Sequence, residues 1–290
     1  MAELEKLASK LSEASIKNYS NPYEEVVWPE TVDKSGWFFA PELISIFGTA
    51  AWEALDEAGR KALSFWEAVN FFSLNINGEK PLVEGLAHRL YRRKGGASEE
   101  AIEAYLHHFL DEENKHMIYF GGFCRRYAGK VYPDKKVAFP REYAPGEEDL
   151  LFFAKVMIFE EIVDVYNVRM SKDDRLDPLA RRINLLHHQD ESRHLAFGRR
   201  YVREIFEKHS PAWSPEIIEG ISQYLKGYLH ATWREYFNPQ VYADAAMAGD
   251  PYDTMEDGWS HPAAAARRAE IGENALRVLR ELGLAAKEET

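Results

Sequence analysis

The sequence predicts an all-α protein built around four long helices. Apolar residues recur at spacings of three and four through long stretches, which is the period of a helix with one buried face. Neither the alternation typical of β-strands nor a repeat of fixed period is evident. At 290 residues, the chain is long enough for one large helical domain with a sizeable core.

The expected order of elements follows from these patterns and from the Gly- and Pro-rich breaks. The four main helices are predicted at residues 61–93, 98–128, 148–171 and 178–208, a fifth at 214–237 and a last one at 262–283. Residues 1–60 indicate a polar start, an extended stretch rich in Pro and Trp, and a short helix. We therefore expect a single domain over residues 1–290: an entry segment (1–60), a metal-binding bundle (61–208) and additional helices (209–290).

Two Glu-x-x-His pairs mark the second and fourth main helices. They are Glu113 with His116 and Glu191 with His194. A spacing of three is nearly one helical turn, so both side chains of a pair project from one face. Each pair lies on the apolar stripe, where an unpaired charge is costly, which disfavours the alternative of solvated contacts on exposed faces. This is the pattern with which ferritin-like four-helix bundles hold two iron or manganese ions, the other two helices each giving one Glu.

The first main helix offers Glu79 or Glu84 as its ligand. Glu79 interrupts an otherwise apolar row, whereas the face of Glu84 carries polar residues. Glu79 and Glu113 also lie about equally far from the turn expected near Gly95 and Gly96, so they come level in an antiparallel pair. Pro81 removes a helical hydrogen bond, and we expect a kink or bulge there.

The third main helix offers Glu160 or Glu161. Both have apolar neighbours at helical spacing, and either comes level with Glu191 when counted from the turn near Asp177 and Pro178. Glu160 is preferred, and the choice between the two stays open at the level of sequence.

His187 precedes Glu191 by four residues on the same face, next to Asn184. A buried histidine with ordinary hydrogen bonds is the alternative, but this position favours a direct metal bond. His188 points about 100° further round the helix and is interpreted, like His107 and His108, as outside the ligand set.

With these residues the chain resembles the AurF-type arylamine N-oxygenases, which are non-haem di-iron enzymes. The resemblance is based on Glu113-x-x-His116, on Glu160 and on His187-x-x-x-Glu191-x-x-His194, together with the segment from Pro41 to Thr49, and covers roughly residues 35–240. It implies two iron ions, with manganese possible, dioxygen as co-substrate and a small-molecule amine as substrate. Together with Glu79, which the pattern of the first main helix favours, the expected ligand set is Glu79, Glu113, His116, Glu160, His187, Glu191 and His194.

The chemistry of the ligands agrees with this resemblance. Carboxylate and imidazole suit divalent iron or manganese, and no set of thiolates favours a closed zinc site. No flavin or nicotinamide fingerprint is evident, so an external electron donor, either a protein or another reductant, is expected. Alternatives are a di-iron hydroxylase acting on carbon, a ferritin-like iron-storing protein and a radical-generating bundle protein; the additional histidine disfavours the last two.

Composition limits the partners. The net charge of −12 argues against nucleic acid and anionic membranes. The one cysteine, Cys124, excludes an internal disulfide and fits a reducing compartment, so a cytoplasmic location is expected. The start of the chain does not have the form of a signal peptide, and no run of about 18 apolar residues predicts a membrane span. A homodimer is possible, with the C-terminal helices as a subunit contact or a cover over the bundle.

Overall fold

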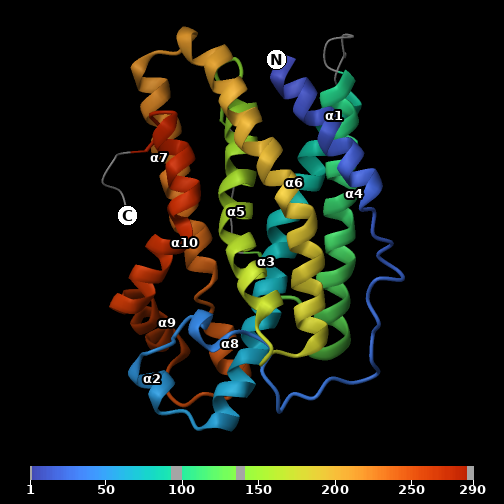
Figure 1. Ribbon diagram of the computed structural model, residues 1–290. Coiled ribbons are helices and arrows are strands. Elements are labelled where there is room, and N and C mark those ends of the chain that lie inside the picture. Colours follow the sequence, from blue (N-terminus) through green and yellow to red (C-terminus); the bar gives the residue numbers. More distant parts are fainter. Residues whose placement is uncertain (1, 93–99, 135–140, 286–290) are drawn as a thin grey trace.

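The computed structural model describes residues 2–92, 100–134 and 141–285. Its centre is a bundle of four long helices: α3 (Glu57–Arg92), α4 (Glu100–Phe123), α5 (Glu147–Lys172) and α6 (Pro178–His209). They run roughly alongside one another, with α3 packed on α4 and α5 packed on α6 (Figure 1). The predicted all-α, ferritin-like bundle with flanking helices is confirmed.

The flanking helices cover the bundle on different sides (Figure 1). Helices α7 (Pro215–Glu235) and α10 (Pro262–Glu281) pack against α5, and α1 (Ala2–Lys17) packs against α4 and α6. The short helices α2 (Ala50–Glu53), α8 (Pro239–Asp244) and α9 (Pro251–Ser260) gather at one end of the bundle. The central helices are therefore enclosed, which allows a polar site to be buried among them.

The turn between α5 and α6 sets the relative level of these two helices. The carboxylate of Asp177 accepts hydrogen bonds from the backbone N–H groups of Leu179 and Ala180 at 3.0 and 3.1 Å, and Pro178 occupies the first helical position. Both features favour a helix start at this point. The backbone N–H of Asp177 also donates to the carbonyl of Trp37 at 2.7 Å, so the entry segment holds the turn in place.

An aromatic core fills the bundle on one side of its polar site. The rings of Phe72 and Phe120 stack at 5.3 Å between centroids, and Phe123 meets Phe72 edge-on at 5.0 Å. Phe65 and Phe38 extend the same packing to the entry segment at 5.2 Å. All five side chains are buried. This packing fixes the separation of α3 and α4 on that side of the bundle.

Two segments contain helices that the sequence patterns did not predict. The polar start is the helix α1, because Leu4, Ala8 and Ser15 lie on one face and are buried against the bundle. The stretch 238–261 holds α8 and α9, each with Pro at its first position and a capping Asn238 or Asp250. Short helices of this kind lack the long apolar period on which the sequence prediction depended.

The expected bulge at Pro81 is absent, since α3 is α-helical from Glu57 to Arg92; a kink there stays a prediction. Pro81 cannot donate to the carbonyl of Asn77, and the helix tolerates that single loss. A π-helical segment occurs instead at the end of α4, at Cys124–Ala128, and ends at Gly129 with a left-handed φ of 71°. The turn expected near Gly95 and Gly96 lies outside the described residues.

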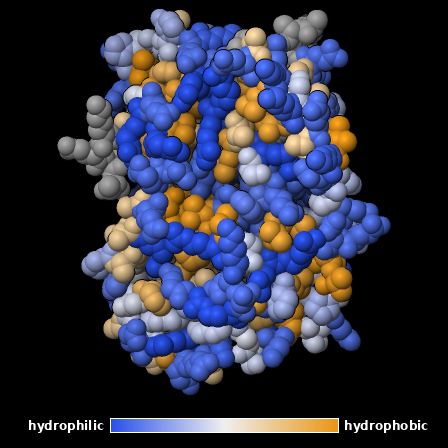
Figure 2. All heavy atoms as spheres, in the orientation of Figure 1, coloured by the Kyte–Doolittle hydropathy of each residue, from blue (hydrophilic) through white to orange (hydrophobic). Residues whose placement is uncertain are grey.

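The surface agrees with a bundle whose apolar side chains face inward. Figure 2 shows hydrophilic residues over most of one face, with hydrophobic residues in separate patches between them. Among the helices that the structure describes, none combines the length and the apolar character needed to cross a membrane.

Candidate metal centre

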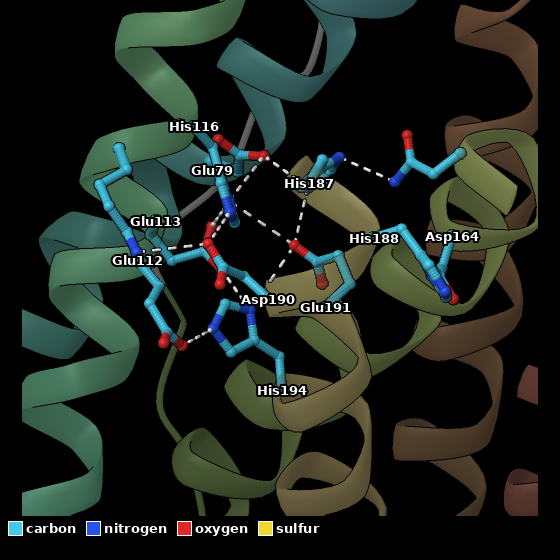
Figure 3. Close-up of polar contacts among 12 residues, drawn as sticks. Glu79, Glu112, Glu113, His116, Asp164, His187, His188, Asp190, Glu191 and His194 are labelled. Atoms are coloured by element: carbon cyan, nitrogen blue, oxygen red, sulfur yellow. Dashed lines mark hydrogen bonds and ion pairs between the residues drawn. The ribbon is translucent and has the colours of Figure 1, made fainter. Parts of the chain in front are cut away.

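Seven ionisable side chains from the four central helices converge inside the bundle. Figure 3 labels all of them except Glu160. They form two groups in which the potential ligand atoms lie within 4.8 Å of one another. One group is Glu79, His116, His187 and Glu191, and the other is Glu113, Glu160, Glu191 and His194. We call all seven the metal-centre cluster. Glu191 belongs to both groups, as expected of a carboxylate between two ions.

The inward atoms of the cluster lie close together. Nδ1 of His194 is 2.8 Å from an oxygen of Glu113 and 3.5 Å from one of Glu191. Nδ1 of His116 is 3.6 Å from Glu191 and 3.8 Å from Glu79. These spacings suit atoms that share a cation about 2 Å from each of them.

Most of these inward atoms have no hydrogen-bond partner. Although Nδ1 of His194 is close to Glu113, the contact is not a hydrogen bond, and both carboxylate oxygens of Glu79 and of Glu113, Nδ1 of His116 and Nδ1 of His194 make none. Each of the four side chains is at most 2% exposed. Burying polar atoms without partners costs several kcal/mol in a protein, so a folded chain retains them only if something satisfies them. A pair of divalent cations would satisfy this donor set.

Side chains outside the cluster contact one ring nitrogen of each histidine in it. Nε2 of His116 lies 3.3 Å from Asp190, and Nε2 of His194 lies 2.9 Å from Glu112. The amide of Asn167 lies 2.8 Å from Nδ1 of His187. A carboxylate behind an imidazole accepts its outer N–H, which fixes the tautomer and leaves the other nitrogen facing the ions.

The two outer carboxylates are joined to each other by Arg193. Its guanidinium donates to Glu112 at 2.5 Å and also contacts Asp190. The ammonium of Lys115 lies 3.4 Å from Asp190. Burial opposes the charged form of both acids, but the hydrogen bond from His116 lowers the pKa of Asp190, and that from His194 lowers the pKa of Glu112. Both outer acids are therefore held as carboxylates.

The pKa values within the cluster show unequal competition for protons. Burial raises the pKa of Glu79 to about 7, helped by the charge of Glu113. Burial, together with the charge of Glu191, raises the pKa of Glu160 well above its usual range. Burial also opposes the charge of Glu191, but His187 and His194 outweigh it and hold its pKa well below the usual range. Cations at the centre would take over the role of these protons.

For the histidines of the cluster, burial lowers the pKa and the neighbouring carboxylates raise it. Burial alone would lower the pKa of His187, but Glu191 and Glu79 raise it to about 9. The pKa values of His116 and His194 are raised well above the ordinary value because surrounding carboxylates outweigh their burial. A metal ligand must be a neutral imidazole, so metal uptake at neutral pH displaces protons from this cluster.

The structure distinguishes the alternatives that the sequence left open. Glu160 faces the cluster with one buried oxygen unsatisfied, whereas Glu161 forms an ion pair with Arg199, one contact of which is 2.8 Å. Glu84 is exposed, on a different face of α3 from Glu79. His187 directs Nε2 to Glu191 at 2.7 Å and to Glu79 at 3.4 Å. The geometry thus brings together the seven residues that were named from sequence.

The remaining histidines lie outside the cluster, as expected. His188 pairs with Asp164 at 2.7 Å, and His107 is exposed. The residues that sequence reasoning missed are the outer partners Glu112, Asp190, Asn167, Arg193 and Lys115. Two of them had a visible signal, because an acidic residue directly precedes the Glu of each Glu-x-x-His pair. Each acid serves the histidine of the opposite helix, which the sequence alone does not show.

Comparison with known proteins agrees with the geometry. The family model described as P-aminobenzoate N-oxygenase AurF matches residues 2–283. The chain therefore belongs to the AurF family, a family of di-iron oxygenases. Because the match spans all four bundle helices, the chain is assigned to an enzyme family, and its buried Glu and His groups are compatible with a metal site.

Relatives among curated proteins carry no described function. Uncharacterized proteins from Mycobacterium bovis and from two strains of Mycobacterium tuberculosis are 23% identical over 212 residues. The alignment covers 70% of this chain and 62% of each relative. This chain therefore spans less than two thirds of the length of these relatives.

Proposed function

We propose that this protein is a dioxygen-activating non-haem di-iron oxygenase that transfers oxygen to the nitrogen of an amine, most readily an arylamine. The observation that carries the proposal is the set of buried, unsatisfied carboxylate and imidazole atoms in the metal-centre cluster. Membership of the AurF family directs the reaction to nitrogen. The proposed ligands are Glu79, Glu113, His116, Glu160, His187, Glu191 and His194.

The donor set fits two divalent ions by charge and by type. Four carboxylates neutralise two dications, and three neutral imidazoles fill part of each coordination shell. Iron at this centre would supply electrons to dioxygen and a position at which it binds. We therefore propose iron, with manganese as the alternative that the same ligands accept.

Residues around the cluster orient its imidazoles and shield it from water. Asp190 and Glu112 accept the outer N–H groups of two imidazoles and keep their Nδ1 atoms facing the centre. The stacking of Phe109 on His194, with ring centroids 3.9 Å apart, covers one side of the cluster and keeps bulk water away from it.

The overall reaction needs a reductant from outside the chain. One oxygen atom of dioxygen enters the hydroxylamine and the other leaves as water, so a turnover takes up two electrons and two protons. Further rounds would give the nitroso and nitro forms. We propose that a separate protein or small reductant delivers these electrons.

The test is oxygen labelling of the product. Purified protein loaded with iron, reduced without oxygen and then mixed with ¹⁸O₂ should convert an arylamine into a labelled hydroxylamine, nitroso or nitro product, read by mass spectrometry. Label found in carbon–hydroxyl groups would identify a hydroxylase instead. Tight binding of iron without oxidation of any amine would favour a storage or radical-generating role.

A further inference from the structure

The three imidazoles of the metal-centre cluster differ in the side chain that contacts their outer nitrogen. Nε2 of His116 and Nε2 of His194 each face a carboxylate, at 3.3 and 2.9 Å. Nδ1 of His187 instead lies 2.8 Å from the amide nitrogen of Asn167. A carboxylate can only accept a hydrogen bond, whereas an amide has a donor on one side and an acceptor on the other. His187 is therefore the imidazole of the cluster whose partner fits either state of the ring nitrogen.

The amide of Asn167 acts as a donor in the arrangement seen here. Its nitrogen points to Nδ1 of His187, and its carbonyl oxygen is buried without a hydrogen-bond partner. A neutral imidazole that accepts at Nδ1 carries its proton on Nε2. Nε2 faces Glu191 at 2.7 Å and Glu79 at 3.4 Å, so this proton is directed to the carboxylates of the cluster (Figure 3). In this tautomer, His187 cannot bind a cation.

A half-turn of the same amide reverses these roles. Rotation about the Cβ–Cγ bond of Asn167 exchanges its oxygen and nitrogen within nearly the same volume, and the oxygen has no hydrogen bond to lose. The carbonyl then accepts a proton from Nδ1, which a ring bound to a cation through Nε2 requires, as does a doubly protonated ring. The amide of Asn167 thus fits His187 both as a ligand and as an unbound neutral side chain.

The packing around His187 keeps its ring in place in either state. The side chain is 1% exposed, and the rings of His116 and Phe120 meet it edge-on at 4.4 and 4.9 Å between centroids. A ring packed in this way has little room to swing when it leaves a cation, so it must be stabilised where it lies. Asn167 on one side and Glu191 on the other provide the two hydrogen bonds that an unbound ring needs.

The other two imidazoles lack this freedom. Arg193 contacts both Glu112 and Asp190, which are held as carboxylates. A carboxylate accepts the outer N–H of its imidazole and leaves the inner nitrogen without a proton. Its charge also strengthens that hydrogen bond and makes the imidazole a better ligand. His116 and His194 are therefore fixed in the tautomer that binds a cation.

We propose that His187 is the exchangeable ligand of the metal centre and that Asn167 is the positioning residue that makes it exchangeable. On detachment the ring loses a proton from Nδ1 and gains one on Nε2, so its charge stays zero. Asn167 changes from acceptor to donor, Glu191 accepts the new N–H, and a coordination position opens without movement of a helix. The inference rests on the metal centre of the proposed function, but its test needs neither an amine nor dioxygen.

The test follows the outer N–H groups of the imidazoles by proton NMR of the protein loaded with Co²⁺, which accepts the same ligands and shifts nearby signals by its paramagnetism. Three such signals are expected, and the one missing from His187→Gln belongs to His187. Each detachment takes the proton off Nδ1. After transfer to D₂O, the His187 signal should therefore decay at least about tenfold faster than the other two.

Two aspartate variants separate the effect of the hydrogen bond from that of an added charge. Asn167→Asp replaces the amide by a carboxylate that can only accept, and should slow the decay of the His187 signal at least about tenfold. Asn184→Asp is the matched control. Asn184 is equally buried, but its amide donates to the carbonyl of Ala180 at 2.7 Å. This control should leave all three decay rates within about twofold, because it leaves the partner of Nδ1 unchanged.

Asn167→Leu provides a second variant that adds no charge, in case the aspartate disturbs folding. Leucine is similar in size and can neither donate nor accept, so a bound His187 would leave its Nδ1–H buried without an acceptor. The His187 signal should disappear while the other two remain. Equal decay of the three wild-type signals would overturn the proposal. Equal slowing by Asn167→Asp and Asn184→Asp, or three unchanged signals in Asn167→Leu, would do the same.

The outcome distinguishes this inference from the proposed function. The expected signals and variant pattern in a protein that forms no labelled product would keep the exchangeable ligand and remove the N-oxygenase assignment. Labelled product from a protein whose three signals decay equally would keep the function and remove the role of Asn167. Absence of all three signals after loading with Co²⁺ would overturn the metal centre and this inference together.

Discussion

Helix α3 carries two buried carboxylates, Glu67 and Glu79, that differ in one respect. Both are at most 4% exposed, and burial raises the pKa of each to about 7. Glu67, however, accepts hydrogen bonds from the N–H and hydroxyl of Ser45, whose hydroxyl also lies 2.9 Å from that of Tyr242. Neither oxygen of Glu79 accepts a comparable hydrogen bond, although Nε2 of His187 lies 3.4 Å from one of them.

This difference shows what distinguishes a structural acid from a binding site. Burial and a raised pKa are common to both residues, so neither identifies function. Glu67 serves the fold, because its partner Ser45 belongs to the entry segment that it fastens to α3. Glu79 lies among six other ionisable side chains, in a donor set that is compatible with a metal site.

The strongest test of the comparison removes the residue that both metal groups share. Glu191→Ala should reduce metal content from about two ions per chain to well below one, because Glu191 belongs to both groups. Metal analysis after reconstitution measures the effect. Glu84→Ala, a change of an exposed Glu on α3, is the control and should retain both ions.

Removing each of the two buried acids of α3 in turn should separate the effect on metal binding from the effect on stability. Glu79→Ala should lose about one ion, whereas Glu67→Ala should keep both and lose about 1–3 kcal/mol of unfolding free energy through its broken hydrogen bonds. Metal analysis and denaturant unfolding give the two readouts. Loss of metal from Glu67→Ala in a folded protein would contradict the contrast.

A pH series should show the cost of burying Glu67. Its pKa rises from 4.5 to about 7 on folding, so the folded state holds the proton more tightly. Its contribution is most favourable below pH 4.5 and declines as the pH rises to about 7, by about 3 kcal/mol at most. The difference between wild type and Glu67→Gln in unfolding free energy should follow this course, and a difference independent of pH would contradict it.

Removing an outer partner of a histidine should have the smallest effect. Asp190→Asn should weaken metal affinity about 10–100-fold without abolishing it, because His116 keeps its position but loses the carboxylate behind it. Competition with a chelator measures the affinity. Ser192→Ala, on the exposed face of the same helix, should leave it unchanged.

Much of the bundle was predictable because its signals are long and local. The apolar period of α6 placed Asn184, His187, Glu191 and His194 on one stripe, and all four are buried together. Counting from the turn at Asp177 brought Glu160 and Glu191 level, and the structure brings them into one group. These inferences needed only helix geometry and the number of residues between each ligand and the turn.

Features that depend on contacts between distant segments were not predictable. Glu160 and Glu161 have equally apolar neighbours in sequence, and only Arg199 from α6 shows which one faces away from the cluster. The helix α1 was missed because its buried face consists of a few small or isolated apolar residues such as Leu4 and Ala8. The crossed pairing of Glu112 and Asp190 with opposite histidines likewise requires the packed bundle.

Arg193 has a consequence for how the bundle responds to deformation. Its guanidinium binds Asp190 of its own helix and Glu112 of α4, so this one side chain links the two helices. Each of those acids braces the histidine of the other helix. A tilt or slide of α6 against α4 would therefore be transmitted to both imidazoles at once, so the two halves of the centre move in step.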